Sequence, residues 1–408
     1  MTINIRKYLS PFFYAAAIAI CLVPLSAEGQ QRQDTARVVP KQRVIVVMMD
    51  GFGPEYLAAS NMPFFKKIMK EGFYKNVKGV MPSVTSVNNA SINCGVVPAL
   101  HGIAGNTFYN VVDGKETLME DSSLLLAPTI FERARKFGVH SALFSSKLKT
   151  IKILSRGTDI AMSPEIATKS WIDAAGPVPD KYTAAVNYWT CRALIHTLKT
   201  RPEIGLYYLH TTDYPMHMWP AGDIRSKDHL QTLDSLFYAI SLAAPDAALF
   251  ITADHGMNHK SRVLDVKNVL AAKGLPIVTA ISPLKDLYPK HHSGFGGVSY
   301  VYLKNPLDRE KVTAALQKTK GIEKVYTRNE FAKQFGQMAE RVGDIVVFGD
   351  KQTVFGELET AVQSERLAAS YRSHGSLYEL QVPLFIYNIA IPDGSFFRNN
   401  FDLVRWLY

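Results

Sequence analysis

Short apolar runs recur along the chain and alternate with longer segments of mixed character. The runs predict buried strands of a parallel sheet at residues 44–49, 139–145, 205–210, 247–252 and 382–387. The segments between them are expected to be helices at residues 61–71, 83–94, 128–137, 182–199 and 226–243. This alternation is typical of an α/β fold with a doubly wound, mostly parallel central sheet and helices on both faces.

The pattern changes character between about residues 262 and 372. Here we expect a strand at 298–303, a helix at 309–318 and a strand at 345–348. These elements predict a small α+β insertion or cap at about 290–370, within one large domain that spans 42–408. The composition, with 47% hydrophobic and 20% charged residues in 408, is that of an ordinary globular protein of this size.

The first 27 residues have the pattern of a secretory signal peptide. Arg6 and Lys7 precede an apolar stretch at 11–24, and small residues follow it at 25–27. The stretch is too short for a comfortable membrane span, so no stable span is expected after cleavage. Residues 28–41 read as a polar linker. The protein is therefore predicted to be exported, to the periplasm, while lipidation at Cys21 and an uncleaved anchor remain alternatives.

Charge and cysteine content narrow the class of protein. The formal net charge is +10, but the chain has no long Lys/Arg run and no nucleic-acid-binding motif, so we expect small anionic ligands rather than nucleic acid. Beyond the signal peptide the cysteines are Cys94 and Cys191. They lack metal-type spacing, and two unpaired thiols are favoured over a disulfide because Cys94 falls in an expected buried helix.

Three of the apolar runs are followed by an aspartate. Asp50, Asp213 and Asp254 come after the runs that begin at Val44, Leu206 and Ala247. The carboxyl ends of parallel strands meet at one edge of a sheet, where chemistry collects in open α/β folds. His255 adjoins Asp254, and His217 follows Asp213 at the spacing of one helical turn. Carboxylates with imidazoles suit a divalent metal, zinc most readily, although each residue alone also fits a structural role.

Other residues gain meaning only beside such a centre. Thr85 stands at an expected helix start, where free N–H groups suit a phosphate and a metal-held threonine could act as a nucleophile; an ordinary N-cap is the alternative. Lys147 and Lys149 follow a predicted strand at a period of two and are expected to point the same way. Asn106 and His374, taken alone, read as a turn residue and a structural histidine.

Several stretches together resemble the alkaline phosphatase superfamily, in particular its phosphodiesterase and nucleotide pyrophosphatase branch and, within it, phosphonoacetate hydrolases. They are Met-Pro-Ser-Val-Thr-Ser-Val-Asn-Asn (81–89), Pro-Ala-Leu-His-Gly-Ile-Ala-Gly-Asn (98–106), Thr-Thr-Asp-Tyr-Pro-Met-His (211–217), Thr-Ala-Asp-His-Gly-Met (252–257) and Arg-Ser-His-Gly-Ser (372–376). The similarity extends from about residue 43 to 390. It implies an alkaline-phosphatase-like catalytic domain.

The resemblance also implies two Zn²⁺ ions and a role for each matching residue. One ion would be held by Asp50, Thr85, Asp254 and His255, and the other by Asp213, His217 and His374. Thr85 matches the nucleophile, and Asn106 the amide that holds a phosphoryl oxygen. Lys147 and Lys149 match a pair that grips the phosphonate and carboxylate of the substrate.

The expected activity is that of a di-zinc hydrolase that cleaves the C–P bond of phosphonoacetate or a similar small phosphonate. The segment Thr-Ser-Val-Asn-Asn is closer to that pattern than the Thr-Phe-Pro-Asn-His of nucleotide pyrophosphatases. A periplasmic phosphodiesterase or nucleotide pyrophosphatase is the alternative within the superfamily, and a non-catalytic anion-binding protein the alternative outside it. Whether His291 and His292 contact the ligand is left open, as is the oligomeric state.

Overall fold

The computed structural model describes residues 37–286 and 293–408. The expected signal peptide, residues 28–36 of the linker, and His291 and His292 lie outside the described residues. Among the helices of the described residues, none has the length and apolar character needed to span a membrane. Cys94 and Cys191 are both buried and unpaired, as predicted.

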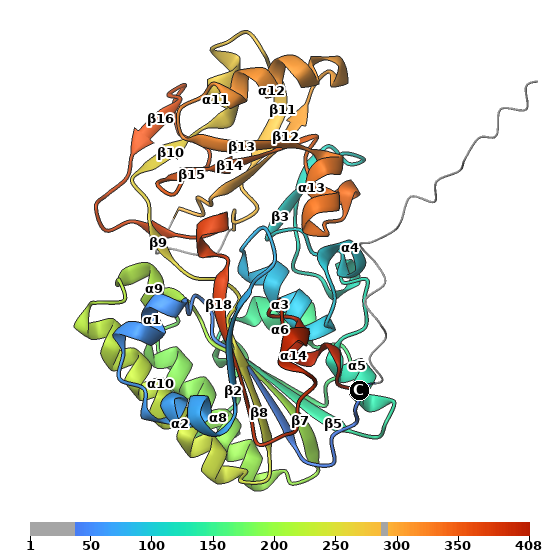
Figure 1. Cartoon of the computed structure of the whole chain (residues 1–408), viewed down its shortest axis with the longest axis vertical. Coiled ribbons are helices and arrows are strands. Elements are labelled where there is room, and N and C mark those ends of the chain that lie inside the picture. The colour runs from blue at the N-terminus through green and yellow to red at the C-terminus, as the bar shows by residue number, and fades with distance from the viewer. Residues whose placement is uncertain (1–36, 287–292) are drawn as a thin grey trace, which may run out of the picture. The chain divides into compact units, whose positions relative to one another are not determined.

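A seven-stranded sheet forms the centre of the fold (Figure 1). Its strands, in spatial order, are β2 (Phe73–Lys78), β18 (Gln381–Tyr387), β8 (Ala248–Thr252), β1 (Val44–Met48), β7 (Ile204–His210), β5 (His140–Ser145) and β6 (Ile160–Met162). β18 runs antiparallel to both of its neighbours, and the β8, β1, β7, β5 and β6 pairings are parallel. The predicted mostly parallel sheet is confirmed. β2 and β6 were not predicted from the sequence, because one is half polar and the other has only three residues.

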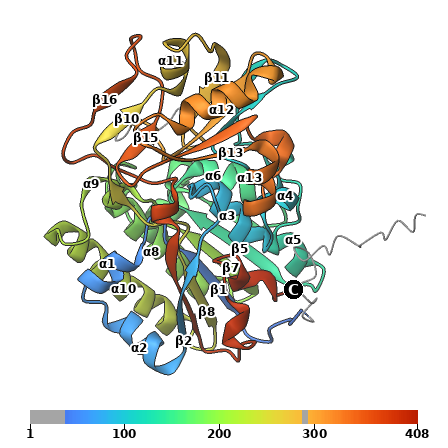
Figure 2. The same ribbon diagram turned by 45° about the horizontal axis from the view of Figure 1, so that its top comes forward.

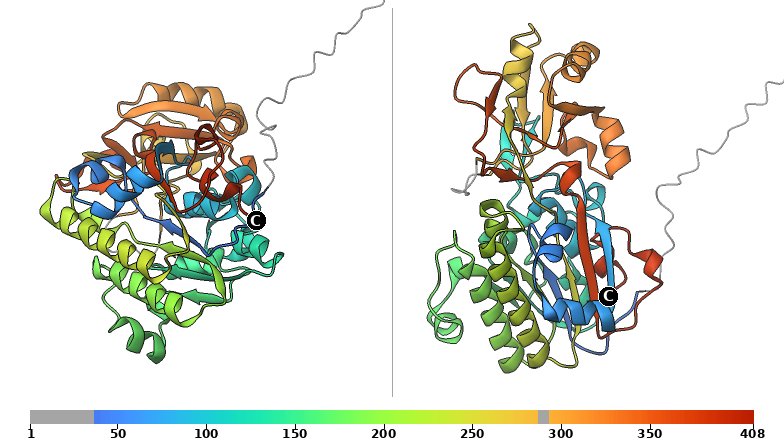
Figure 3. Two further views of the ribbon diagram at one scale, coloured as in Figure 1. Left: turned by 60° about the horizontal axis from the view of Figure 1, so that its bottom comes forward. Right: turned by 60° about the vertical axis from the view of Figure 1, so that its left-hand side comes forward.

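Helices cover both faces of this sheet (Figures 1 and 3). On one face lie α2 (Pro63–Glu71), α8 (Ala185–Thr200) and α10 (Ile224–Ala243), and on the other α3 (Thr85–Cys94), α5 (Ile130–Arg135) and α14 (Asp402–Arg405). The shorter helices are α1 (Pro54–Ala59), α4 (Pro98–His101), α6 (Leu148–Leu154), α7 (Lys169–Ala175) and α9 (Tyr214–Met218). Tyr208 of β7 shows how a face is filled: its ring packs edge-on against Phe131 of α5, and its hydroxyl donates to Asn89 of α3.

The strand ends are aligned across the middle of the sheet. Met48, the last residue of β1, pairs with His210 of β7 on one side and with Thr252 of β8 on the other. The chain therefore leaves these three strands at the same level. The residues that follow them are brought to one edge, as the sequence pattern predicts.

Smaller sheets lie beyond this edge (Figure 2). The largest is antiparallel, in the order β11 (Ile277–Ile281), β12 (Val298–Leu303), β14 (Ile345–Gly349) and β13 (Ile322–Thr327). The helices of this region are α11 (Val266–Ala271), α12 (Arg309–Gln317) and α13 (Arg328–Phe335). Short strands complete it: β10 (Arg262–Leu264) between β15 (Thr353–Phe355) and β16 (Ser364–Arg366), the hairpin β3 (Thr107–Asn110) and β4 (Lys115–Leu118), and the pair β9 (Asn258–His259) and β17 (Arg372–Ser373).

This region also contains β10, α11 and β11, which precede residue 290. It has an apolar core of its own, which includes Leu270, Val301 and Val347. It also holds the loops at the carboxyl edge of the main sheet. Arg341 donates to the carbonyl of Gly102, and the Tyr300 hydroxyl to that of Ala104.

Candidate active site

Three aspartates meet at the carboxyl edge of the main sheet. Asp50, Asp213 and Asp254 are 0%, 3% and 0% exposed. The loops after β1 and β7 approach closely at Gly51, where φ is +74° and a Cβ would lie 3.0 Å from the Cβ of Asp213. Glycine tolerates both the positive φ and the close approach. The three predicted carboxylates are therefore brought together by the strand register and by this glycine.

Asp50, Asp254 and His255 form one compact group whose candidate ligand atoms all lie within 4.8 Å of one another. Nε2 of His255 is 3.4 Å from Oδ1 of Asp50 and 3.2 Å from Oδ2 of Asp254. Oδ1 of Asp254 accepts hydrogen bonds from the backbone N–H groups of Gly51 and His255, whereas Oδ2 accepts none from the described residues. A buried carboxylate oxygen without a donor fits contact with a cation.

A second group lies beside the first. Asp213, His255 and His374 also meet within 4.8 Å, so His255 belongs to both groups. His374 Nε2 is 3.6 Å from Oδ2 of Asp213, and His217 Nε2 is 2.9 Å from the same oxygen. His217 follows Asp213 by four residues on the short helix α9, as the spacing predicts.

The histidines face the carboxylates with the same ring nitrogen. Nδ1 of His217, His255 and His374 lies 2.9, 2.9 and 2.7 Å from the backbone carbonyl of Arg372, Gly256 and Ser83, respectively. A carbonyl only accepts, so each Nδ1 carries a proton and each Nε2 faces carboxylate oxygen. Burial lowers the pKa of His255 and of His374, which favours the neutral form of these two rings. Imidazole nitrogens that face carboxylates fit divalent metal ions held between them.

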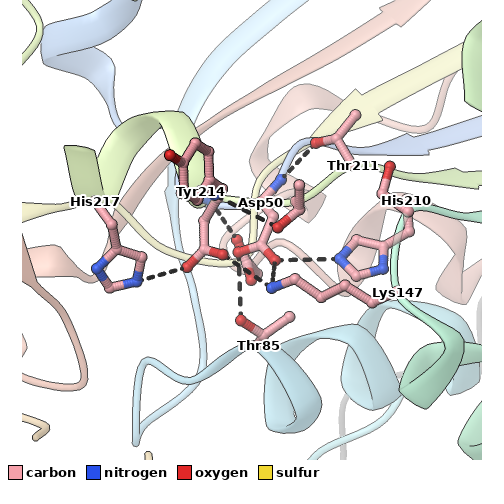
Figure 4. Close-up of polar contacts among 12 residues, drawn as sticks. Asp50, Thr85, Lys147, His210, Thr211, Tyr214 and His217 are labelled. Carbon is pink, nitrogen blue, oxygen red and sulfur yellow. Dashed lines mark hydrogen bonds and ion pairs between the residues drawn. The ribbon is translucent and has the colours of Figure 1, made fainter. Parts of the chain in front are cut away.

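Lys147 supplies a positive charge at the centre of the group (Figure 4). Its Nζ lies 2.6 Å from Oδ2 of Asp50 and 2.9 Å from Oδ1 of Asp213. Burial raises the pKa of both carboxyls, but this ammonium together with the neighbouring imidazoles holds the pKa of Asp50 and of Asp213 below the ordinary range. Burial and the Asp50 carboxylate raise the pKa of Asp254. Three carboxylates against one ammonium leave a centre that favours further cations.

Thr85 is the first residue of α3, and its hydroxyl points into this centre (Figure 4). Its Oγ1 lies 3.3 Å from Oδ1 of Asp50 and 3.3 Å from Nε2 of His255. The open end of the centre is a cavity of about 150 Å³. The residues that line it include Thr85, Asn106, Lys147, Lys149, Asp213 and His374. Six of the predicted site residues thus surround one space.

Asn106 reaches the cavity from the loop after α4, and its amide is held on both sides. Ser86 donates to its Oδ1 at 2.7 Å, and its Nδ2 donates to the carbonyl of Leu284 at 3.1 Å. A second N–H of the same amide remains for another acceptor. Ser86, which follows Thr85 in α3, thereby orients Asn106 in the wall of the cavity.

The expected strand-like alternation of Lys147 and Lys149 is wrong. β5 ends at Ser145, whose hydroxyl accepts from the backbone N–H of Lys147, and the chain turns at once into α6. The two lysines nevertheless line the same cavity, because one precedes the helix and the other lies in its first turn. Lys149 Nζ is 2.8 Å from Oδ2 of Asp286.

Two residues at the site, His210 and Asp286, have no role that was predicted from the sequence. His210 lies behind Asp50, with Nε2 at 3.3 Å from its Oδ2, while Nδ1 lies 2.9 Å from the hydroxyls of Ser145 and Thr150 (Figure 4). The sequence does contain a signal for His210, because a histidine at the end of an apolar run is a candidate site residue. Asp286 lies in a loop of the smaller-sheet region, far from any recognisable motif, and no sequence signal could have found it.

Comparison with known proteins identifies the family. Residues 44–376 match the model of the Type I phosphodiesterase / nucleotide pyrophosphatase family. The chain belongs to this family. The predicted superfamily branch and fold class are thereby confirmed, and at the level of the family so is the prediction of a hydrolase.

Solved structures show the likeness over the whole fold. Crystal structures of phosphonoacetate hydrolase from Sinorhizobium meliloti 1021, in complex with phosphonoformate and with phosphonoacetate, are 29% and 30% identical to this member, with a TM-score of 0.82. The match covers 91% of this chain and 96% of that one. Murine ectonucleotide pyrophosphatase / phosphodiesterase 5 shares the fold, with a TM-score of 0.64, 19% identity, and coverage of 89% of this chain and 93% of that one.

A curated relative lies on the nucleotide side of the family. It is a bis(5'-adenosyl)-triphosphatase of Mus musculus, 23% identical over 259 residues, which are 61% of this chain and 54% of the relative. The chain thus spans about half the length of this relative.

Proposed function

We propose that this family member is a di-zinc hydrolase that uses Thr85 as its nucleophile and cleaves the C–P bond of phosphonoacetate or a similar small phosphonate. The observation that carries the proposal is the position of the Thr85 hydroxyl, 3.3 Å from both Asp50 and His255 at the edge of the cavity. The likeness to phosphonoacetate hydrolase over nearly the full chain supports the choice of substrate.

The metal ligands of the proposal are the residues of the two compact groups, together with Thr85 and His217 beside them. Asp50, Thr85, Asp254 and His255 would hold one zinc ion, and Asp213, His217 and His374 the other. The shared orientation of the imidazoles, each with its Nε2 facing carboxylate oxygen, supports this assignment. Bound metal would offset charge on the phosphoryl oxygens and lower the pKa of the Thr85 hydroxyl.

The chain's own residues then account for the chemistry. The Thr85 hydroxyl, which is oriented by its hydrogen bond to Oδ1 of Asp50, loses its proton to water, and its oxygen attacks phosphorus. The P–C bond breaks, the carbon keeps the electron pair, and protonation by water gives acetate. A water molecule then hydrolyses the phosphothreonine, which releases phosphate and restores Thr85.

Donors around the cavity stabilise the charge that develops on phosphorus. The free N–H groups at the start of α3 and the remaining N–H of Asn106 suit the phosphoryl oxygens. Lys147 and Lys149 would bind the phosphonate and the carboxylate of the substrate.

The second candidate is a phosphodiesterase or nucleotide pyrophosphatase. It is favoured by the family itself and by the bis(5'-adenosyl)-triphosphatase relative. The same nucleophile and metal ligands would serve, with an alkoxide or a phosphate as the leaving group. Under either candidate, we propose one catalytic domain of residues 42–408, exported under the direction of the signal peptide at 1–27.

The experiment that tests the proposal compares two substrates. Zinc-loaded protein is incubated with phosphonoacetate and, separately, with bis-p-nitrophenyl phosphate, and released phosphate and nitrophenolate are measured. Phosphate from phosphonoacetate supports C–P bond hydrolysis. Nitrophenolate alone supports the phosphodiesterase, and neither product from zinc-loaded protein rejects both candidates.

A further inference from the structure

A buried ion pair lies outside the residues assigned so far. Glu379 and Lys260 both have side chains that are 0% exposed, with Nζ of Lys260 2.8 Å from Oε1 of Glu379. Burying two charges is costly unless their remaining hydrogen bonds are also satisfied. In Glu379 both carboxylate oxygens are fully engaged.

The contacts of Glu379 connect two separate segments of the chain. Its Oε1 accepts from Nδ2 of Asn258 and from Lys260, both at 2.8 Å. Its Oε2 accepts from the backbone N–H and the hydroxyl of Ser376, at 3.0 and 2.6 Å. Its backbone carbonyl accepts from the N–H of Gly256 at 2.7 Å. One residue therefore fixes residues 256–260 against residues 374–376.

The two histidines that meet in the site are attached to these segments. His255 directly precedes residues 256–260, and His374 is the first residue of 374–376. Their rings are stacked, with centroids 3.5 Å apart and an angle of 13° between the planes. Both belong to the group that includes Asp213. The separation of their Nε2 atoms thus depends on how firmly the two segments are held together.

We propose that Glu379 and Lys260 are positioning residues that set the distance between His255, a ligand of one proposed zinc ion, and His374, a ligand of the other, and thereby the affinity with which the centre binds zinc. The proposal rests on the proposed function for the assignment of these histidines as metal ligands. Lys260 also donates to the backbone carbonyl of Lys351 at 3.2 Å, which ties the smaller-sheet region to the same point.

The variant that tests this removes both charges together. Lys260→Met with Glu379→Gln leaves no unpaired buried charge, and replacement of a whole buried pair is often tolerated by a fold. The metal-free full chain is titrated with Zn²⁺ by calorimetry, and zinc per chain is measured after dialysis. We expect the double variant to fold and to lose about 10–100-fold in affinity for one zinc equivalent, as for other groups that orient metal ligands.

Asp234→Asn is the matched control. Asp234 is also buried, at 3% exposed, but it accepts hydrogen bonds from the backbone N–H groups of Phe64 and Phe65. It therefore joins α10 to α2, away from the two histidines. This variant should lower the thermal stability of the metal-free protein and leave zinc affinity as in the wild type. An unchanged zinc titration in the folded double variant would overturn the positioning role.

A milder variant covers the case in which the double variant does not fold. Asn258→Ala removes one hydrogen bond to Glu379 and leaves the ion pair in place. It should weaken zinc binding several-fold, and wild-type affinity in this variant would overturn the proposal. Absence of zinc binding by the wild-type chain would overturn the proposed function as well. Normal binding by the wild type and the double variant alike would overturn only the positioning role.

Discussion

The ammonium group of Lys149 lies 2.8 Å from Oδ2 of Asp286, and both side chains line the cavity beside Thr85. The two side chains are only 13% and 12% exposed, so the pair is largely shielded from water. A substrate carboxylate that binds Lys149 must therefore compete with Asp286. In this family member, Asp286 would control how strongly the far end of the substrate is held.

Asp286→Asn should strengthen the binding of a carboxylated phosphonate, because it removes the competing anion. We expect the KM for phosphonoacetate to fall several-fold, while Lys149→Ala raises it by about tenfold, the equivalent of ~1.4 kcal/mol for one lost charge contact. The KM for bis-p-nitrophenyl phosphate, which has no carboxylate, should change little in either variant. Steady-state kinetics with both substrates measures this.

Asp173→Asn provides the control for a general change in charge. Asp173 pairs with Lys169 on the surface of α7, where both side chains are mostly exposed. It should leave both KM values unchanged. Equal shifts for the two substrates in Asp286→Asn would contradict a carboxylate role for Lys149.

Binding of the carboxylate should also depend on pH through Lys149. Burial lowers the pKa of Lys149 from its ordinary value of 10.5, even with Asp286 beside it. The charged form exists below that lowered pKa, so the KM for phosphonoacetate should rise on the alkaline side earlier than an ordinary lysine would allow. Lys149→Arg keeps its charge at high pH and should abolish this rise. A KM profile that is identical in the two proteins would contradict the assignment.

Much of the site could be predicted from the sequence because it follows from strand ends. Asp50, Asp213 and Asp254 each follow an apolar run, and the register of β1, β7 and β8 brings such positions to one edge. Asp286 and Glu379 could not be predicted. Their ion-pair partners, Lys149 and Lys260, are more than a hundred residues away in the chain, and the packing of the smaller-sheet region decides which charges they meet.

The lysines show a different limit. Lys147 and Lys149 were predicted to point the same way, and both do line the cavity, but the reason for the prediction was wrong. A period of two predicts a shared direction only while the chain remains extended. The chain turns after Ser145, and a helix start brings the two side chains to the cavity instead.

Replacement of Thr85 tests the nucleophile. Thr85→Ala should lower kcat by at least about 10³-fold with either substrate, because no other hydroxyl replaces the attacking oxygen. Thr85→Ser retains an oxygen and should keep part of the activity. Zinc content should remain at two per chain in both variants, since the carboxylates and imidazoles are intact. Full activity in Thr85→Ala would reject the assignment, and Thr232→Ala on the exposed side of α10 serves as the control.

Lys147 should contribute more to the stability of the metal-free protein than to that of the zinc-bound protein. In the metal-free protein its ammonium is the positive charge in contact with Asp50 and Asp213, so Lys147→Met should lower the free energy of unfolding by about 1.5–3 kcal/mol, as expected for hydrogen bonds to charged groups. With zinc bound, the ions offset the same carboxylates and the loss should be smaller. Denaturant unfolding with zinc and with chelator measures the difference.

Lys67→Met is the control for that experiment, because Lys67 lies near Glu71 at 3.9 Å and the two side chains are 46% and 47% exposed. Such a surface pair contributes at most about 1 kcal/mol, and its loss should not depend on metal. An equal loss of stability for Lys147→Met in both conditions would mean that zinc does not share the charge of Asp50 and Asp213. The metal ligands would then have to be sought elsewhere among the carboxylates and imidazoles of the site.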